Sequence, residues 1–191
     1  MNRAVAMGGR FALAVAVLIG LAALAYRVEH PSIVVHEERR SVNQGMGDMA
    51  EVSALMERLQ ANPEDQDAMR HLGMLFMQMG AWARAMSFWD MLLGKVPEDL
   101  EALNQKGVCL FQLGRHPEAA EVFSRMLQVD AQNPHAHYNL GVLYAYYLNA
   151  TDTARGHFEA VVRGPDARLA AQAKEDLAAL GAENALTPQS R

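Results

Sequence analysis

Residues 69–97 read MRHLGMLFMQMGAWARAMSFWDMLLGKVP, and this stretch decides the fold of most of the chain. Gly73 and Ala85 are small enough to let two antiparallel helices approach each other closely. Trp89 is large enough to fill the space between one pair of helices and the next. Pro97 ends the second helix, because proline lacks the N–H group that a helix interior needs. The stretch therefore predicts one helical hairpin with a closely packed interior.

The same pattern returns twice at an interval of 34 residues, which is a signature of a repeat architecture. Lys106 replaces a leucine and Ala131 replaces the terminating proline, and the third copy gains one residue near 148–151. The equivalent positions are Leu72-Gly73, Lys106-Gly107 and Leu140-Gly141; Phe76, Leu110 and Tyr144; Ala85, Ala119 and Ala154; and Trp89, Phe123 and Phe158.

These residues resemble the pattern of the tetratricopeptide-repeat (TPR) family over 49–180, about two-thirds of the chain. The resemblance implies an all-α solenoid of antiparallel helix hairpins. Helices that flank such arrays cover the terminal apolar faces. We expect repeats at about 66–99, 100–133 and 134–167, an N-terminal helix at 49–61, a cap helix at 166–180 and a disordered tail at 182–191. Asp166 is the expected N-cap of the cap helix, and Gly181 is expected to follow its end.

An uncharged block, Phe11–Tyr26, follows Arg3 and Arg10 near the N-terminus. As a helix it would be about 24 Å long, a little short of the hydrocarbon core of about 30 Å. Residues 4–26 complete the span if Arg10 extends to the lipid headgroups. The arginines precede the block, so the rest of the chain should face the periplasm, with the anchor in the inner membrane.

A cleavable signal peptide is the alternative for residues 1–27. Ala23-Leu24-Ala25 has the small-residue pattern of a cleavage site, and cleavage there would leave a soluble periplasmic protein. Both interpretations export the body. Residues 28–48 are charged, lack helical periodicity and are expected to form a tether.

The net charge, the single cysteine and the lack of known catalytic motifs argue against several classes of function. The chain has a net charge of −5, and removing residues 1–27 leaves 14 basic and 22 acidic residues, which argues against nucleic acid as a partner. Cys109 is the only cysteine, so no internal disulfide, paired-cysteine redox site or haem-attachment motif is possible. No catalytic or phosphate-binding motif is present, and we expect neither an enzyme nor a cofactor.

The histidines and methionines do not predict a metal site. His135 and His137 are two residues apart and therefore point to different faces of a helix. His71, His116 and His157 are isolated in sequence and are expected at the surface or at helix ends. Several methionines of 69–91 fit repeat core positions, so packing or a binding groove is favoured over copper coordination.

The family resemblance implies a concave groove lined by the first helix of each repeat. Such a groove suits an amphipathic helix or an extended hydrophobic segment. Most of its expected lining is apolar or aromatic, with an arginine and an asparagine as polar contacts. The alternative is that some of these residues pack against the tether or the cap helix. The expected lining residues are Arg70, Met74, Met77, Asn104, Val108, Phe111, Tyr138, Val142 and Tyr146.

Residues 55–73, LMERLQANPEDQDAMRHLG, resemble the start of the periplasmic TPR subunits of bacterial cytochrome c maturation. Those subunits hold unfolded apocytochrome for haem ligation, so the resemblance implies a membrane-tethered apocytochrome chaperone. A scaffold for pilus or outer-membrane assembly is a second hypothesis. A periplasmic copper or metal carrier that uses the methionines and histidines is a third.

Overall fold

The computed structural model describes residues 47–186, and every regular element in this range is an α-helix. The expected membrane or signal segment at 1–27, nearly all of the tether at 28–48, and residues 187–191 lie outside the described residues. Within 47–186 no helix has the length and apolar character needed to cross a membrane.

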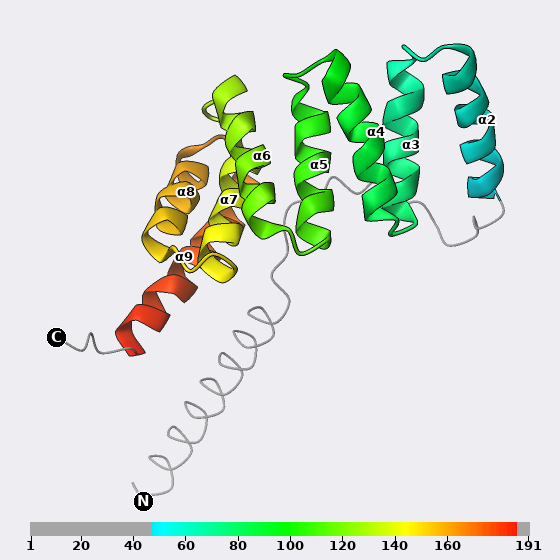
Figure 1. Ribbon diagram of the computed structural model, residues 1–191. Coiled ribbons are helices and arrows are strands. Elements are labelled where there is room, and N and C mark those ends of the chain that lie inside the picture. The colour runs from blue at the N-terminus through cyan, green and yellow to red at the C-terminus, as the bar shows by residue number, and fades with distance from the viewer. Residues whose placement is uncertain (1–46, 187–191) are drawn as a thin grey trace, which may run out of the picture.

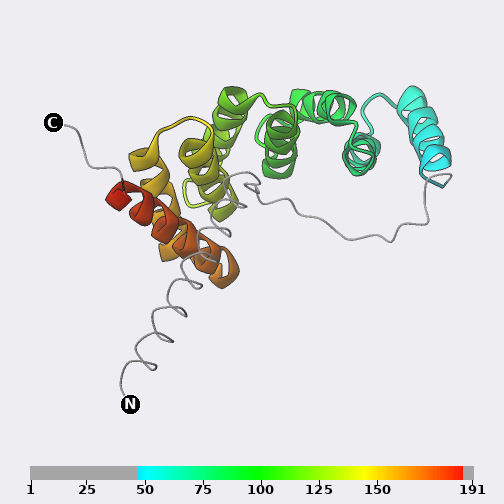
Figure 2. The same ribbon diagram turned by 90° about the horizontal axis from the view of Figure 1, so that it is seen from below.

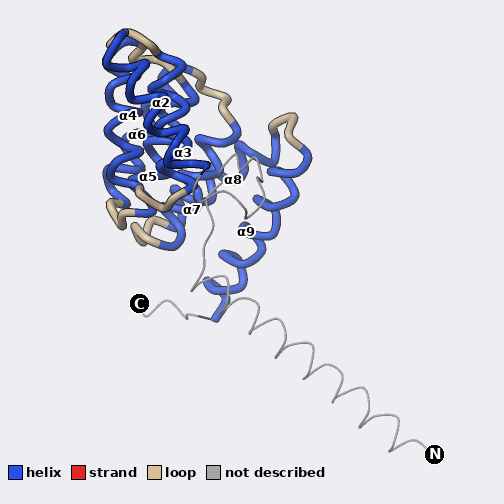
Figure 3. Tube along the Cα trace, turned by 90° about the vertical axis from the view of Figure 1, so that its right-hand side faces the viewer, coloured by secondary structure: helices blue, strands red, loops and turns tan. Residues whose placement is uncertain are grey.

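The helices follow one another as antiparallel neighbours in a curved row (Figure 1). Seen from the side, short loops join them (Figure 3). The expected all-α solenoid of hairpins is confirmed for this part of the chain. The helices are α2 (Gly47–Ala61), α3 (Gln66–Gln78), α4 (Trp82–Lys95), α5 (Leu100–Gln112), α6 (His116–Val129), α7 (Pro134–Tyr146), α8 (Thr151–Arg163) and α9 (Ala167–Leu186).

Side-chain caps start the first helix of each hairpin. A cap accepts a hydrogen bond from a backbone N–H group that has no partner within the helix. The expected N-cap Asp166 does this for α9, where its Oδ1 accepts from the N–H of Leu169 at 2.9 Å. The three repeats use the same device at intervals of 34 residues: Asp65 accepts from Ala68 at 2.9 Å, Asp99 from Ala102 at 2.8 Å, and Asn133 from Ala136 at 3.0 Å.

The turn inside each hairpin depends on one residue in a left-handed conformation. Gly80 and Gly114 have φ values of +69° and +72°, which glycine adopts without a steric cost. The third turn uses Asn149, with φ of +51°, and this residue stands 35 positions after Gly114. The extra residue predicted near 148–151 is therefore in the turn between α7 and α8.

Helices α3 and α5 lie on one side of the row, and α4 and α6 lie on the other (Figure 2). Large aromatic side chains fill the interior between the two helices of each hairpin. Trp89 was expected between one pair of helices and the next, but it lies inside its own hairpin, against α3. Trp89, Phe123 and Phe158 are completely buried. Each of these rings lies against the glycine of the preceding helix, which is Gly73, Gly107 or Gly141. The three hairpins thus repeat one packing arrangement.

Lys106 stands where the other two repeats have a buried leucine, Leu72 or Leu140. The structure explains this departure from the repeat pattern. The Lys106 stem is part-buried, and its ammonium group lies 2.6 Å from Oδ1 of Asp90 on α4. The ion pair lets a charged residue occupy a core position while its head reaches the surface.

The cap helix is longer than the sequence predicted. We expected it to end at Leu180 with a disordered tail from residue 182, but α9 continues to Leu186. Gly181 does not adopt the left-handed conformation that would end the helix. Residues 182–186 are AENAL, mostly good helix formers, which favours continuation of the helix.

Candidate functional site

All nine residues expected to line the groove lie on α3, α5 and α7, but the structure divides them into two groups. A residue must be at least part-exposed to meet a ligand without a rearrangement of the fold. Four residues are part-exposed: Arg70, Met74, Phe111 and Tyr146. Five are buried: Met77, Asn104, Val108, Tyr138 and Val142.

Three buried members of the set belong to contacts between helices. The indole Nε1–H of Trp89 donates to Sδ of Met77 at 3.3 Å. The side-chain amide of Asn139 donates to Oδ1 of Asn104 at 3.4 Å, which joins α7 to α5. Val108 is completely buried. Because these side chains already fill the interior, they support the surface but do not form it.

Helix α9 covers the two tyrosines of the set. The hydroxyl of Tyr138 donates to Oδ2 of Asp176 at 3.0 Å, and the hydroxyl of Tyr146 donates to Oδ1 at 3.1 Å. Asp176 is only 1% exposed. For these tyrosines the alternative interpretation, packing against the cap helix, is what the structure shows. A sequence signal existed, because Asp176 interrupts the apolar face of an alanine-rich helix.

The accessible part of the predicted surface lies on α3 and α5. The Arg70 guanidinium donates to Oδ2 of Asp99 at 2.9 Å and pairs with Glu101. Burial opposes ionisation of Asp99, but hydrogen bonds from Arg70 and from the N–H of Ala102 outweigh it and hold the pKa of Asp99 below its usual range. Met74, one turn after Arg70 on α3, presents a part-exposed thioether. A charged cluster and an apolar side chain thus stand next to each other.

An aromatic cluster lies at the end of α5. Phe111 packs edge-on against Tyr147 at 5.1 Å between ring centroids, and His116 lies 4.1 Å from Tyr147 and 5.3 Å from Phe111. His116 is at a helix end as expected, but it is not isolated. Burial lowers the pKa of His116, which favours the neutral ring in this apolar setting.

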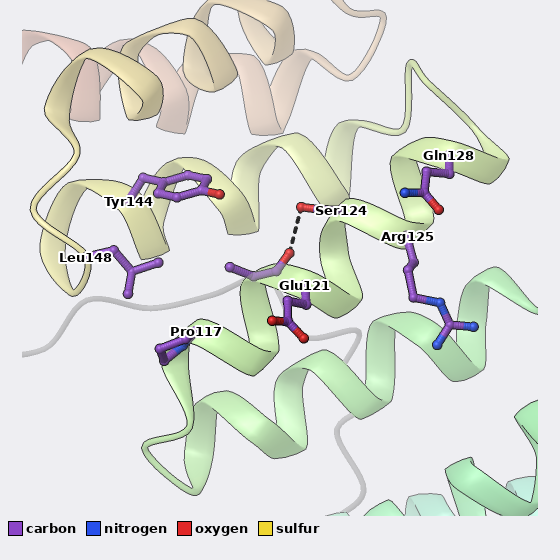
Figure 4. A pocket seen from close by; sticks show the side chains of 8 residues that line it. Pro117, Glu121, Ser124, Arg125, Gln128, Tyr144 and Leu148 are labelled. Atoms are coloured by element: carbon purple, nitrogen blue, oxygen red, sulfur yellow. Dashed lines mark hydrogen bonds between the residues drawn. The ribbon is translucent and has the colours of Figure 1, made fainter.

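A hollow of about 480 Å³ lies along α6, on a side of the array that the sequence did not single out (Figure 4). Polar side chains of α6 form one wall, and Tyr144 and Leu148 close one end. Ser124 is already engaged, because its hydroxyl donates to the carbonyl oxygen of Ala120 at 2.7 Å. The lining residues are Pro117, Ala120, Glu121, Ser124, Arg125, Gln128, Tyr144 and Leu148.

The structure also places the residues that the sequence offered for metal binding or thiol chemistry. No group of three or more His, Cys, Asp or Glu side chains within the described range is placed to hold a metal ion. Met69 is completely buried. Burial, and then the negative charge of Asp90, raise the pKa of the Cys109 thiol to about 12, so this thiol is unreactive at neutral pH.

Two segments match family models. Residues 67–99 match the model described as tetratricopeptide repeat, and residues 107–146 match the model described as TPR repeat. The first segment contains the α3–α4 hairpin, and the second runs from α5 through α7. Both lie within the array predicted from the sequence.

Two relatives share part of the chain. The uncharacterised protein y4yS of Sinorhizobium fredii is 30% identical over 108 residues, which are 56% of this chain and 59% of y4yS. A tomato (Solanum lycopersicum) protein named a probable UDP-N-acetylglucosamine–peptide N-acetylglucosaminyltransferase, SPINDLY, is 28% identical over 109 residues. That match covers 57% of this chain and 12% of SPINDLY. The chain thus spans less than two-thirds of either relative.

Solved structures share the fold. MamA superposes with a TM-score of 0.64 at 17% identity, covering 73% of this chain and 75% of MamA. YrrB, described as a TPR protein with an unusual peptide-binding site, has a TM-score of 0.60 at 26% identity. That match covers 68% of this chain and 66% of YrrB.

Proposed function

We propose that this chain binds a polypeptide segment on the surface formed by α3 and α5, because residues 67–99 and 107–146 match models of the tetratricopeptide repeat. The TPR fold is generally a non-enzymatic interaction module. The observation that carries the proposal is the part-exposed thioether of Met74 beside the Arg70 ion-pair cluster. The similarity to YrrB, described as having a peptide-binding site, supports the same class of function.

The charges on this surface favour a ligand with both apolar and basic side chains. Arg70 is paired with two carboxylates, Asp99 and Glu101, so its positive charge is already balanced. Asp67, one turn earlier on α3, adds another exposed carboxylate. A lysine or arginine of a ligand would meet this negative excess, while an apolar neighbour packs on Met74.

We propose a membrane-tethered chaperone of apocytochrome c in the periplasm as the specific role. Three features support it: the uncharged block at 11–26, the arginines before it, and the resemblance of residues 55–73 to the cytochrome c maturation subunits. A scaffold for pilus or outer-membrane assembly would use the same surface. Cross-linking to a partner in cells distinguishes these roles by the identity of the captured polypeptide.

A photo-cross-linking residue in place of Met74 should capture a polypeptide in cells. The same residue in place of Met91, a methionine of α4 that is 41% exposed, should not. Met74→Glu should then weaken binding of the captured partner about 30-fold, because a carboxylate in an apolar contact costs about 2 kcal/mol. Calorimetry with the purified partner measures the change.

Met91→Glu is the matched control and should leave affinity within about twofold, since it adds the same charge to the other side of the array. Equal loss of binding by both variants would point to a non-specific effect of charge. Loss with Met91→Glu alone would place the partner on the α4 side and contradict the proposal.

Export of the body has its own test. A reporter enzyme that is active only outside the cytoplasm, fused after Arg191, should be active because Arg3 and Arg10 hold the N-terminus inside. Replacing both arginines by glutamate should lower that activity severalfold. A fusion that is active only with a cytoplasmic reporter would contradict both the anchor and the signal-peptide hypotheses.

A further inference from the structure

Two histidines face each other inside the third hairpin. His137 on α7 and His157 on α8 have their Nδ1 atoms 2.9 Å apart, and both side chains are part-buried. From the sequence we expected His157 to be isolated, and this was wrong. His137 and His157 are 20 residues apart in sequence, but they meet across the hairpin. No other hairpin of the described chain has such a pair.

The corresponding positions of the other repeats are apolar. One period or two periods before His137 stand Leu103 and Met69, both completely buried. With the extra residue of the third turn counted, His157 corresponds to Val122 of the second repeat. Two titratable rings therefore stand at positions that the second repeat fills with buried apolar side chains, which do not titrate.

The hydrogen bonds define the protonation of the closed pair. Nε2 of His137 lies 3.1 Å from the carbonyl oxygen of Ala131. A carbonyl oxygen only accepts, so Nε2 carries the hydrogen and Nδ1 of a neutral His137 is an acceptor. The hydrogen between the rings must then belong to Nδ1 of His157. With no added proton, the closed pair therefore consists of two neutral rings in two different tautomers.

The pair tolerates one added proton and not two. A single imidazolium still donates to its neutral neighbour, although a partly buried charge is unfavourable. When both rings are protonated, two N–H groups point at each other across 2.9 Å and two positive charges are in contact. We propose that His137 and His157 form an acid-sensitive latch that holds α7 to α8 at neutral pH and releases them in acid.

The groups around the pair do not compensate for added charge. Tyr144 of α7 stacks on His157 with ring centroids 5.7 Å apart. In the turn before α7, the Asp130 carboxylate already accepts from the backbone of Gln132 and the side chain of Asn133. Burial and His137 are the causes of the lowered pKa of His157, and no carboxylate is among them. Glu121 and Arg125 of α6 line the hollow beside Tyr144, and Asp176 of α9 accepts hydrogen bonds from two tyrosines. On α8, Arg155 lies two residues before His157, and Glu159 pairs with Arg163.

The direction of the pH effect follows from this burial. Burial, and then the charge of His137, lower the pKa of His157 to about 4, below the ordinary histidine value of about 6.5. The opened state binds more protons than the closed state between these two values. The contribution of the histidine pair to the free energy of unfolding is thus present above about pH 6.5 and is lost as the pH falls toward 4. Helix α9, which packs on α8, should loosen with the latch.

Urea unfolding of the full chain in a mild non-ionic detergent, followed by circular dichroism at pH 7 and pH 5, tests the latch. The unfolding equilibrium constant of the wild type should rise about tenfold on acidification. The variant His137→Leu/His157→Val introduces the residues of the second repeat. Its unfolding equilibrium constant should change less than about threefold between pH 7 and pH 5. His71→Gln, at an exposed position on α3, should behave as the wild type does.

Nitrogen-15 NMR of the imidazole rings gives an independent readout, even if a variant folds poorly. At pH 7 the wild type should show one ring protonated at Nε2 and one at Nδ1. An ordinary histidine titration of His157 near pH 6.5, or equal pH dependence of the wild type and the double variant, would overturn the proposal. So would a pH effect that disappears with a chelator, because that would make the pair a metal site.

Discussion

Replacing Trp89 by alanine should lower the free energy of unfolding by about 3–5 kcal/mol, the range for removing a buried aromatic side chain. The ring is completely buried between α3 and α4, where it covers Gly73. The change also removes the donor to Sδ of Met77. The helices are joined by short turns and cannot close the resulting cavity without shifting the neighbouring repeat. Urea unfolding at pH 7 measures the effect.

Trp82→Ala is the matched control, since Trp82 begins the same helix but is only part-buried. We expect less than half the loss seen at Trp89, because less apolar area leaves the core. A loss below about 1 kcal/mol at Trp89 would contradict the described packing.

The second large effect concerns Gly107 on α5. A Cβ atom at this position would lie 2.5 Å from Cε1 of Phe123, which is itself completely buried. Gly107→Leu should therefore cost about 3 kcal/mol or more, at the upper end for overpacking of a core, because the ring has no free space to move into. Thermal and urea unfolding of the variant check this value.

Gly156 on α8 provides the opposite case. It is exposed within a helix, and a Cβ atom there has no heavy atom within 4 Å. Gly156→Ala should raise the free energy of unfolding by roughly 0.5–1 kcal/mol through the better helix propensity of alanine. If both glycine variants were destabilised to the same degree, close helix contact could not be the reason for Gly107.

The repeated elements of the fold were predictable because they depend on local chemistry. The cap Asp166 follows from its residue type at the start of an amphipathic helix, and the extra residue near 148–151 follows from the 34-residue interval. The structure has both. The end of α9 was not predicted. A glycine such as Gly181 ends a helix only when the following chain turns away, and sequence does not show which way it turns.

The candidate site was predictable only in part, because exposure depends on neighbouring repeats. Asn104 and Val108 have groove positions in the repeat pattern, yet adjacent helices bury both. Tyr146 was expected to correspond to Phe111, but it stands 35 residues after Phe111. The position one full period of 34 residues after Phe111 is Ala145. The contact between His137 and His157 spans 20 residues across an irregular turn, so no periodicity reveals it.

The hydrogen bonds from Tyr138 and Tyr146 to Asp176 also join the third hairpin to α9 through one specific polar contact. A buried carboxylate satisfied by two hydroxyl groups is suited to one partner surface, unlike the interchangeable apolar contacts between hairpins. Over residues 167–181, the exposed side of α9 carries Lys174 and Glu175 and offers a further hairpin little apolar area. Gene duplication can therefore lengthen this protein by adding interior units such as residues 100–133, whereas growth beyond α9 would first require a new terminal helix.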